Sequence, residues 1–281
     1  MEIKYIRTFW GSEHQSAKTF LKESIAKGFE GVEINFPEDD GFIEEFMTEL
    51  QAIRNEHPTF TFIAQQVLEN KAETATEYTE RMSERLRILL ALRPDAINSH
   101  TGKDFFEFEE NVKIIAAAER LSEEAGIPIW HEIHRGRFSF HLKTLLNYLT
   151  VFPHLNLIAD LSHFCVVSES NLSDQQDLLT QIYPHIRHIH ARVGFEQSPQ
   201  VNHPFAPEWK EHLDRYVNWW TEIIEHQSQQ GKAHFTITPE FGPFPYMPQA
   251  PFSKEPTANQ QEINVQMKDY LQQQWNKHAF E

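Results

Sequence analysis

Strand-like and helical segments alternate eight times along this chain, and no other feature of the sequence limits its fold as strongly. Each strand-like segment is a short run of apolar and β-branched residues, and each helical segment repeats apolar residues every three or four positions. The expected strands are residues 3–10, 31–36, 59–67, 95–100, 127–134, 155–161, 186–193 and 234–241. An uninterrupted alternation of this kind favours parallel strands that close into a barrel over an open sheet.

We therefore expect an α/β protein with one (β/α)₈ TIM barrel domain over residues 1–281, because no break in composition marks a second domain. Two long loops, 194–208 and 242–256, follow strands and should lie on the rim where barrel enzymes carry their active sites. The second loop is rich in proline and aromatic residues. We expect it to form either a semi-rigid lid over a pocket or a solvated connector, followed by a C-terminal helix at about 258–277.

Charge and cysteine content narrow the class of partner. The formal net charge is −16, and no cluster of Lys and Arg is present, which argues against binding to nucleic acid. Cys165 is the only cysteine, so a disulfide framework and a thiolate zinc site are excluded. No apolar run reaches membrane-spanning length, and the chain opens on a strand pattern rather than a signal peptide. We expect a cytoplasmic protein that acts on a small molecule and not on a membrane.

Residues suited to metal binding gather at the ends of the last four strands. Each follows an apolar run, and together they are Glu132, Asp160, His190 and Glu240. Strand ends converge at one rim of a barrel, so these side chains could approach one another. Three carboxylates and an imidazole suit Mn²⁺, Mg²⁺, Co²⁺ or Zn²⁺ better than Cu⁺ or an iron–sulfur cluster. Clustered carboxylates also repel unless a cation neutralises them. Any one of these residues alone is more often structural, but four at separate strand ends favour one divalent metal ion.

Further polar residues near the same rim have two interpretations each. His100 ends the fourth strand and either contacts substrate or a ligand, or is a structural histidine. His134 lies beyond Glu132 on the same strand face, which favours substrate contact. Arg135 and Arg137 either bind an anionic group, such as a phosphate or carboxylate, or pair with surface acids.

Residues at the ends of the first two strands are less informative. Trp10 and Phe36 either form an apolar wall for a sugar face or belong to the core. Glu33 is expected in the polar interior of the barrel, with no role assigned.

His188 in the seventh strand, one layer below His190, is expected to be a packed, hydrogen-bonded neighbour.

Four short motifs resemble those of the xylose isomerase-like barrel superfamily, in particular its sugar phosphate isomerase/epimerase and ketose 3-epimerase branch. The motifs are Glu132-Ile133-His134, Asp160-Leu161-Ser162-His163, His188-Ile189-His190 and the Glu240 that closes the last strand. The resemblance implies metal ligands at Glu132, Asp160, His190 and Glu240. It also implies substrate contacts at His163 and Arg192, although Arg192 lies closer to the ligand histidine than the arginine of the epimerases usually does. The second acidic residue that the epimerases carry after strand five is missing here.

The resemblance implies a divalent-metal-dependent isomerase or epimerase of a sugar, sugar phosphate or keto-polyol. The ion would stabilise the enediolate formed when a carbon beside a carbonyl loses a proton. Glu132 and Glu240 would remove and return that proton, and His163 and Arg192 would hold oxygens where negative charge grows. The pattern leaves the substrate and the metal open. Members of this branch often pair through rim surfaces, which allows a homodimer.

Three alternatives stay open. A dehydratase of the same superfamily would use the same fold and metal. A metal-dependent phosphodiesterase resembling endonuclease IV would need a histidine after strand three, where this chain has Gln65-Gln66-Val67, and an Asp-x-His pair where it has Asn202-His203. A non-catalytic sugar binder would not require two glutamates beside an ion.

Overall fold

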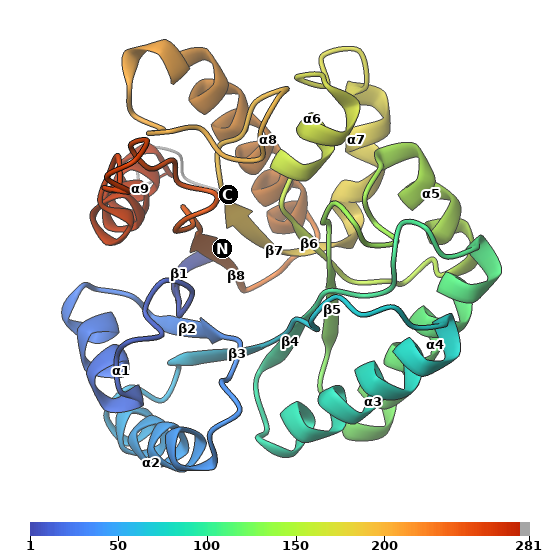
Figure 1. Ribbon diagram of the computed structural model, residues 1–281, viewed down its shortest axis with the longest axis horizontal. Coiled ribbons are helices and arrows are strands. Elements are labelled where there is room, and N and C mark those ends of the chain that lie inside the picture. Colours follow the sequence, from blue (N-terminus) through green and yellow to red (C-terminus); the bar gives the residue numbers. More distant parts are fainter. Residues whose placement is uncertain (276–281) are drawn as a thin grey trace.

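The computed structural model describes residues 1–275, and its strands form a closed barrel (Figure 1). Neighbouring strands pair in parallel in chain order, and β1 also pairs with β8, which closes the ring. The strands are β1 (Glu2–Thr8), β2 (Gly31–Ile34), β3 (Thr61–Gln66), β4 (Ala96–Ser99), β5 (Ile129–Glu132), β6 (Leu157–Ala159), β7 (Ile186–Ala191) and β8 (His234–Pro239). The expected TIM barrel is therefore confirmed.

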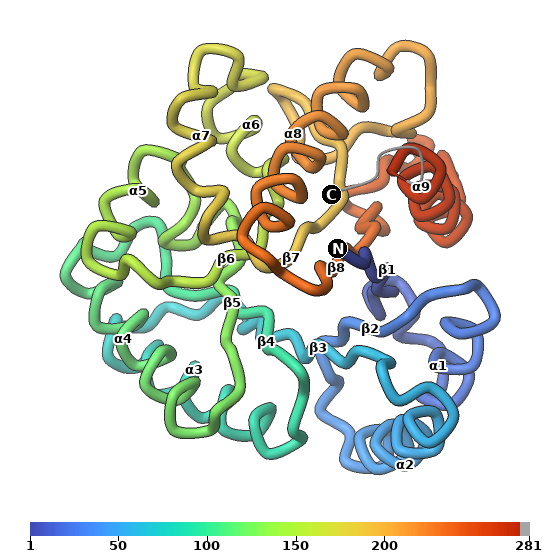
Figure 2. Tube along the Cα trace, turned by 180° about the vertical axis from the view of Figure 1, so that it is seen from behind, coloured from blue at the N-terminus to red at the C-terminus, as the bar shows by residue number. Residues whose placement is uncertain are grey.

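Helices surround the barrel, as the two opposite views show (Figures 1 and 2). They are α1 (Ala17–Ala26), α2 (Asp40–Glu56), α3 (Ala75–Ala91), α4 (Phe108–Ala125), α5 (Leu142–Val151), α6 (Ser162–Ser168), α7 (Gln176–Ile182), α8 (Lys210–Gln229) and α9 (Gln260–Trp275), with short 3₁₀ turns at Tyr183–His185 and Pro207–Trp209. The helix expected at about 258–277 is α9, and positions 276 and 277 lie outside the described residues. No described helix combines the length and the apolar character that crossing a membrane requires.

Local signals in the sequence explain where several helices begin and end. Ser16 caps α1 by accepting a hydrogen bond from the Thr19 backbone, and Thr74 forms a capping box with Glu77 at the start of α3. Gly126 ends α4 at φ 65°, a left-handed conformation that glycine adopts without strain. The sequence therefore sets these helix ends locally.

Two expectations about the elements need correction. All eight strands end earlier than expected, and β3 to β6 also begin later, so Asp160, Arg192 and Glu240 lie just beyond the strands that carry them. At the rim, the backbone leaves the strand ladder to enter the connecting loops. The sequence also gave no sign of α6, whose seven residues have no side-chain cap and follow β6 almost directly.

The alternation of side chains along β5 decides which residues reach the interior. His131 points outward, where its Nε2 lies 3.0 Å from Glu119 on α4. Glu132, the next residue, is buried inside the barrel. Most apolar packing lies in two clusters, one around Phe62 and one around Trp220, and a small third cluster holds Phe241, Met247 and Ile263. The polar residues of the interior therefore sit on a packed apolar frame.

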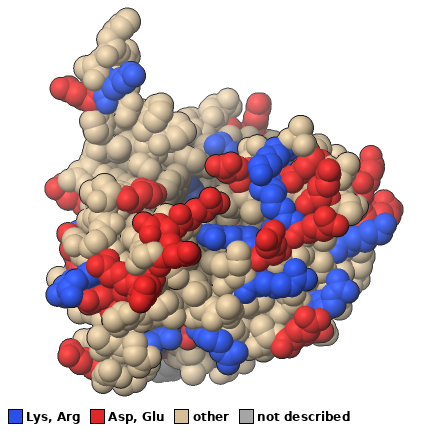
Figure 3. All heavy atoms as spheres, turned by 60° about the horizontal axis from the view of Figure 1, so that its bottom comes forward, with Lys and Arg blue, Asp and Glu red and all other residues tan. Residues whose placement is uncertain are grey.

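Acidic and basic side chains are interspersed on the surface that Figure 3 shows, and no broad basic area covers that face. The view agrees with the composition, in which Asp and Glu outnumber Lys and Arg by 41 to 25. The absence of a nucleic-acid partner stays a prediction.

Candidate metal and substrate site

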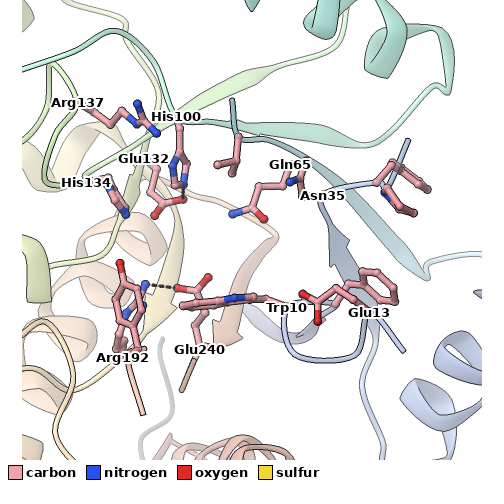
Figure 4. A pocket seen from close by; sticks show the side chains of 15 residues that line it. Trp10, Glu13, Asn35, Gln65, His100, Glu132, His134, Arg137, Arg192 and Glu240 are labelled. Carbon is pink, nitrogen blue, oxygen red and sulfur yellow. Dashed lines mark hydrogen bonds and ion pairs between the residues drawn. The ribbon is translucent and has the colours of Figure 1, made fainter. Parts of the chain in front are cut away.

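A cavity of about 470 Å³ opens at the C-terminal rim of the barrel. Its walls differ in chemistry: one is mainly apolar and comes from the ends of the first three strands, and the other is polar and charged (Figure 4). The apolar wall consists of Phe9, Trp10, Phe36, Pro37 and Val67, and the polar wall of His100, Glu132, His134, Arg137, Arg192 and Glu240. A cavity of this volume suits a small molecule.

The four residues expected to bind a metal come together beside this cavity. Nδ1 of His190 lies 2.9 Å from Oε2 of Glu240 and 3.7 Å from Oε1 of Glu132. Asp160, His190 and Glu240 offer ligand atoms that all lie within 4.8 Å of one another, and Asp160 meets the same limit with Glu132. Metal–ligand bonds of about 2.0–2.6 Å place ligand atoms at most about 5 Å apart. The structure thus brings the four side chains together, and their role as ligands stays a prediction.

Glu33 on β2 supports His190 from below, a contact that the sequence did not reveal. Its carboxylate accepts a hydrogen bond from Nε2 of His190 at 3.0 Å and from the Thr238 hydroxyl at 2.8 Å. Because a carboxylate only accepts, Nε2 carries the hydrogen, and Nδ1 is the atom left for another partner. Nδ1 is buried, and among residues 1–275 it makes no hydrogen bond of good geometry, since its 2.9 Å approach to Oε2 of Glu240 is an ion-pair contact only. A ligand histidine held by a carboxylate in this way is common at metal sites.

The charges around His190 also attract a cation. Burial opposes protonation of the ring, but the carboxylates of Glu240, Glu33 and Glu132 outweigh that effect and raise the pKa of His190 well above its usual value. Burial is the main cause that raises the pKa of Asp160. The charges of Glu240 and Glu132 raise it further, and the guanidinium of Arg192 lowers it. Negative charge is therefore in excess at this point of the barrel.

Arg192 lies between two of the proposed ligands. It donates hydrogen bonds to Oδ2 of Asp160 and, at 2.6 Å, to Oε2 of Glu240. Its guanidinium also lies 4.7 Å from the ring of Tyr246 and 5.5 Å from the ring of Trp10. The guanidinium and a protonated His190 together neutralise only part of the charge of the four buried carboxylates, Glu33, Glu132, Asp160 and Glu240. The donor set, the orphaned Nδ1 and the excess negative charge together fit a divalent metal ion.

Three further histidines surround Glu132 and Asp160. Nε2 of His100 lies 2.9 Å from Oε2 of Glu132, so His100 contacts a proposed ligand as well as the cavity. His134 lines the cavity, and its contact with substrate stays a prediction. His163 is fully buried, with Nε2 at 3.4 Å from Oδ2 of Asp160 and its ring 3.9 Å from that of His134. His163 is not among the residues that line the cavity, and its contact with substrate stays a prediction.

The protonation state of His134 follows from its surroundings. Burial is the main cause that lowers its pKa well below the usual value, so the ring is neutral. Nδ1 lies 2.5 Å from the backbone oxygen of Arg135, which only accepts, so Nδ1 carries the hydrogen. Nε2 is then an unprotonated nitrogen beside the cavity, where it can accept a proton.

The expectation for His188 agrees with the structure. Its two ring nitrogens lie 2.7 Å and 2.9 Å from the hydroxyls of Thr236 and Thr238 on β8. It is a packed histidine below the site.

The loop 242–256 divides into two parts. Tyr246 lines the cavity and packs edge-on against Trp10, with ring centroids 5.0 Å apart. Gln200 from the loop 194–208 holds the start of this segment by hydrogen bonds to both backbone groups of Gly242. Phe252, in contrast, is fully exposed. The first part therefore covers the cavity as a lid would, and the part around Phe252 extends into solvent.

Comparison with known proteins identifies relatives by structure only. No protein-family model and no curated protein matches the sequence. Among solved structures, a probable 3-DHS dehydratase, AsbF, of Bacillus anthracis is 21% identical with a TM-score of 0.63, covering 95% of this chain and 98% of its own. The IolI protein with a bound zinc atom is 14% identical with a TM-score of 0.61, covering 95% and 96%.

A third solved structure carries the family description that the sequence motifs suggest. It is a xylose isomerase-like TIM barrel protein from Mycobacterium smegmatis in complex with magnesium. It is 10% identical with a TM-score of 0.63, covering 96% of this chain and 95% of its own. The chain therefore shares the fold of the xylose isomerase-like TIM barrel proteins.

Proposed function

We propose that this protein is a cytoplasmic, divalent-metal-dependent isomerase or epimerase that acts on a sugar, a sugar phosphate or a keto-polyol. One observation carries the proposal: the orphaned Nδ1 of His190 faces Glu132 and Glu240 at the edge of a cavity of about 470 Å³. Structures of similar fold bind zinc or magnesium, which supports a metal here.

The two glutamates can move a proton because each keeps one oxygen free. Glu132, Asp160, His190 and Glu240 would hold the divalent ion, and the ion would supply positive charge that makes a carbon beside a substrate carbonyl more acidic. Oε1 of Glu240 has no polar contact among residues 1–275, and Oε1 of Glu132 has only the 3.7 Å contact with His190. Oε2 of Glu132 is already engaged by Asn98 and His100. Glu240 is therefore the stronger candidate to remove the first proton, and Glu132 to return it.

A second candidate function is that of a dehydratase, and His134 is the observation that favours it. Elimination of water requires one base to remove a proton and does not require a second base to return it. Neutral His134 lines the cavity, has its hydrogen on Nδ1 and can accept a proton on Nε2 without being one of the proposed metal ligands. The structural similarity to a probable 3-DHS dehydratase points in the same direction.

Metal binding is tested first. Purified protein is incubated separately with Mn²⁺, Zn²⁺, Co²⁺ and Mg²⁺, desalted and assayed for bound metal, beside Glu240→Gln, Asp160→Asn and the exposed control Glu84→Gln. We expect about one ion per chain in the wild type and in Glu84→Gln, and a large loss in the other two variants. Equal metal content in all four proteins would exclude this ligand set.

The reaction is tested with metal-loaded protein in D₂O and a panel of ketoses, sugar phosphates and keto acids, followed by NMR and mass spectrometry. An isomerase or epimerase gives a deuterated product of unchanged composition. A dehydratase gives a product that has lost water, and His134→Gln should then abolish the reaction. If the metal is bound but no compound gives either kind of product, both proposals are contradicted.

The end of β3 argues against the phosphodiesterase. Gln65 and Val67 line the cavity there, where that class of enzyme needs a histidine ligand. An oligonucleotide with an abasic site should accordingly remain uncleaved in the presence of each metal.

A further inference from the structure

Arg137, in the loop after β5, is buried on the cavity wall without a counter-charge. It is only 7% exposed and lines the cavity beside His100 and His134 (Figure 4). Among residues 1–275 its side chain has no hydrogen-bonding partner and no carboxylate within 4.0 Å, and its Nε is fully buried. The guanidinium is therefore desolvated on one side and open to the cavity on the other.

The other two buried arginines of the described chain show what Arg137 lacks. Arg7 pairs with Glu23 at 3.1 Å, and Arg192 pairs with Asp160 and Glu240. Removing a guanidinium from water costs free energy unless an anion and hydrogen-bond acceptors replace the water. Because Arg137 finds no such anion within the described protein, the missing partner has to come from the cavity.

A second cation strengthens the positive potential on this side. Lys103 is 4% exposed, and its Nζ is bound to the neutral amide oxygen of Asn70 at 2.6 Å. Burial is the main cause that lowers the pKa of Lys103, and the charge of Arg137 lowers it further. Two buried cations thus reinforce each other on the β4–β5 side of the cavity. Figure 4 shows Arg137 and His100 across the cavity from Arg192 and Glu240.

We infer that Arg137 binds a carboxylate group on the substrate, on the side of the cavity opposite Glu240. This inference rests on the proposed function, since it defines the class of sugar-derived substrate for the same site. Hydroxyl groups of a neutral sugar would satisfy the N–H donors but not the charge. The planar guanidinium matches the two oxygens and the single charge of a carboxylate, whereas a phosphate dianion would call for a second cation on the cavity wall, and Lys103 is not among the residues that line the cavity. The substrate is therefore a hydroxylated carbonyl compound that bears an acid group.

The free protein provides a test that needs no substrate. Arg137→Met keeps an unbranched stem of the length of the apolar part of the arginine side chain and removes the guanidinium with its charge. If the charge of Arg137 is unpaired in the free protein, its removal should raise the midpoint temperature of thermal unfolding by about 2 °C or more above that of the wild type. Arg87→Met, an exposed residue on α3, changes the net charge equally and should leave the midpoint unchanged. A lower midpoint for Arg137→Met would assign Arg137 a structural role and overturn the inference.

Ligand binding provides the second test, with metal-loaded wild type, Arg137→Met and Arg87→Met. The probes are D-glucose, D-glucuronate and glucose 6-phosphate, which differ only at C6, and three matching compounds of the galactose series. We expect the uronates to bind at least tenfold more tightly than the neutral sugars, and this preference to disappear only in Arg137→Met. A preference for the phosphates alone, or for uronates in all three proteins, would overturn the carboxylate assignment. If no probe binds, the unfolding midpoint decides.

The test separates this inference from the proposed function. Metal content should be the same in Arg137→Met and the wild type, because Arg137 touches none of the four proposed ligands. Binding of a uronate through Arg137 without any proton exchange in D₂O would uphold the carboxylate site and reject the isomerase. Proton exchange on a neutral sugar at equal rates in all three proteins would uphold the isomerase and reject the carboxylate site.

Discussion

The two halves of the barrel use the same strand–helix unit for different purposes. Just beyond strands β1 to β3 lie Phe9, Trp10, Phe36 and Val67, which belong to the apolar wall of the cavity. Strands β5 to β8 end in carboxylates, histidines and an arginine, several of them fully buried. The fold alone does not impose this division, since every strand end reaches the same rim.

The difference shows how such a site divides binding from chemistry. The charged half brings together groups that repel or desolvate one another, and each of them raises the free energy of the folded protein unless a partner compensates. The apolar half packs on the cluster around Phe62 and stabilises the fold. Changes in the charged half should therefore alter turnover and metal affinity, and changes in the apolar half should alter substrate affinity.

The largest effect is expected at Glu132. In Glu132→Gln, kcat should fall by about 10²–10⁴-fold, because the amide keeps the shape of the side chain but loses a metal ligand and a proton acceptor. Turnover is measured by deuterium exchange on the substrate that the panel identifies. Glu84→Gln serves as the matched control. A Glu132→Gln variant that turns over at the wild-type rate would remove the charged half from the chemistry.

A residue of the first half that supports the second half should give the next largest effect. Glu33→Gln should weaken Mn²⁺ binding by about 10–100-fold, because Nε2 of His190 loses its carboxylate acceptor. Calorimetric titration measures the affinity. Glu30→Gln, which changes a carboxylate at the opposite end of the same strand, should leave it unchanged. Equal affinity in both variants would mean that the two halves are independent.

Trp10 tests the apolar wall. Trp10→Leu should raise KM about tenfold, which corresponds to the loss of about 1.4 kcal/mol of contact with the substrate. Metal affinity should stay the same, because Trp10 contacts Arg192 and Tyr246 but no proposed ligand. Phe105→Leu, at an exposed aromatic residue, is the control. A change in metal affinity of similar size would show that the wall is not separate from the charged half.

The smallest effect is expected at Cys165 on α6, behind Asp160. Burial raises the pKa of this thiol to about 12, whereas an unfolded chain ionises near 8.5. The stability that comes from keeping the thiol protonated is fully present below about pH 8.5 and is lost as the pH rises towards 12. At pH 9 the free energy of unfolding has fallen by less than about 1 kcal/mol for this reason. Native protein should therefore resist iodoacetamide at pH 8.5, and urea-unfolded protein should react. Rapid labelling of the native protein would show that water reaches the interior of the charged half.

The charged half could be predicted from the sequence and the apolar half could not. Glu132, Asp160 and Glu240 stand out because a carboxylate at the end of an apolar run is unexpected unless it has a function. Trp10 and Phe36 end their strands in the same way, but aromatic residues in a core have the same pattern.

Contacts across the barrel also escape a reading of the sequence. Glu33 and His190 are 157 positions apart, and only the closure of the ring places β2 opposite β7. Helix α6 was missed because seven residues carry too little periodicity and no capping side chain. Arg137 was recognised as an anion-binding candidate, but its lack of an acidic neighbour is a property of the folded chain.

The pairing of β1 with β8 has a consequence for how the protein is made. During synthesis β1 leaves the ribosome before the other strands of the barrel, and its partner β8 emerges more than 200 residues later. Glu240 emerges with that last strand, so a nascent chain can hold at most three of the four proposed ligands until the ring is ready to close. Metal capture should therefore belong to the finished chain and not to the growing one.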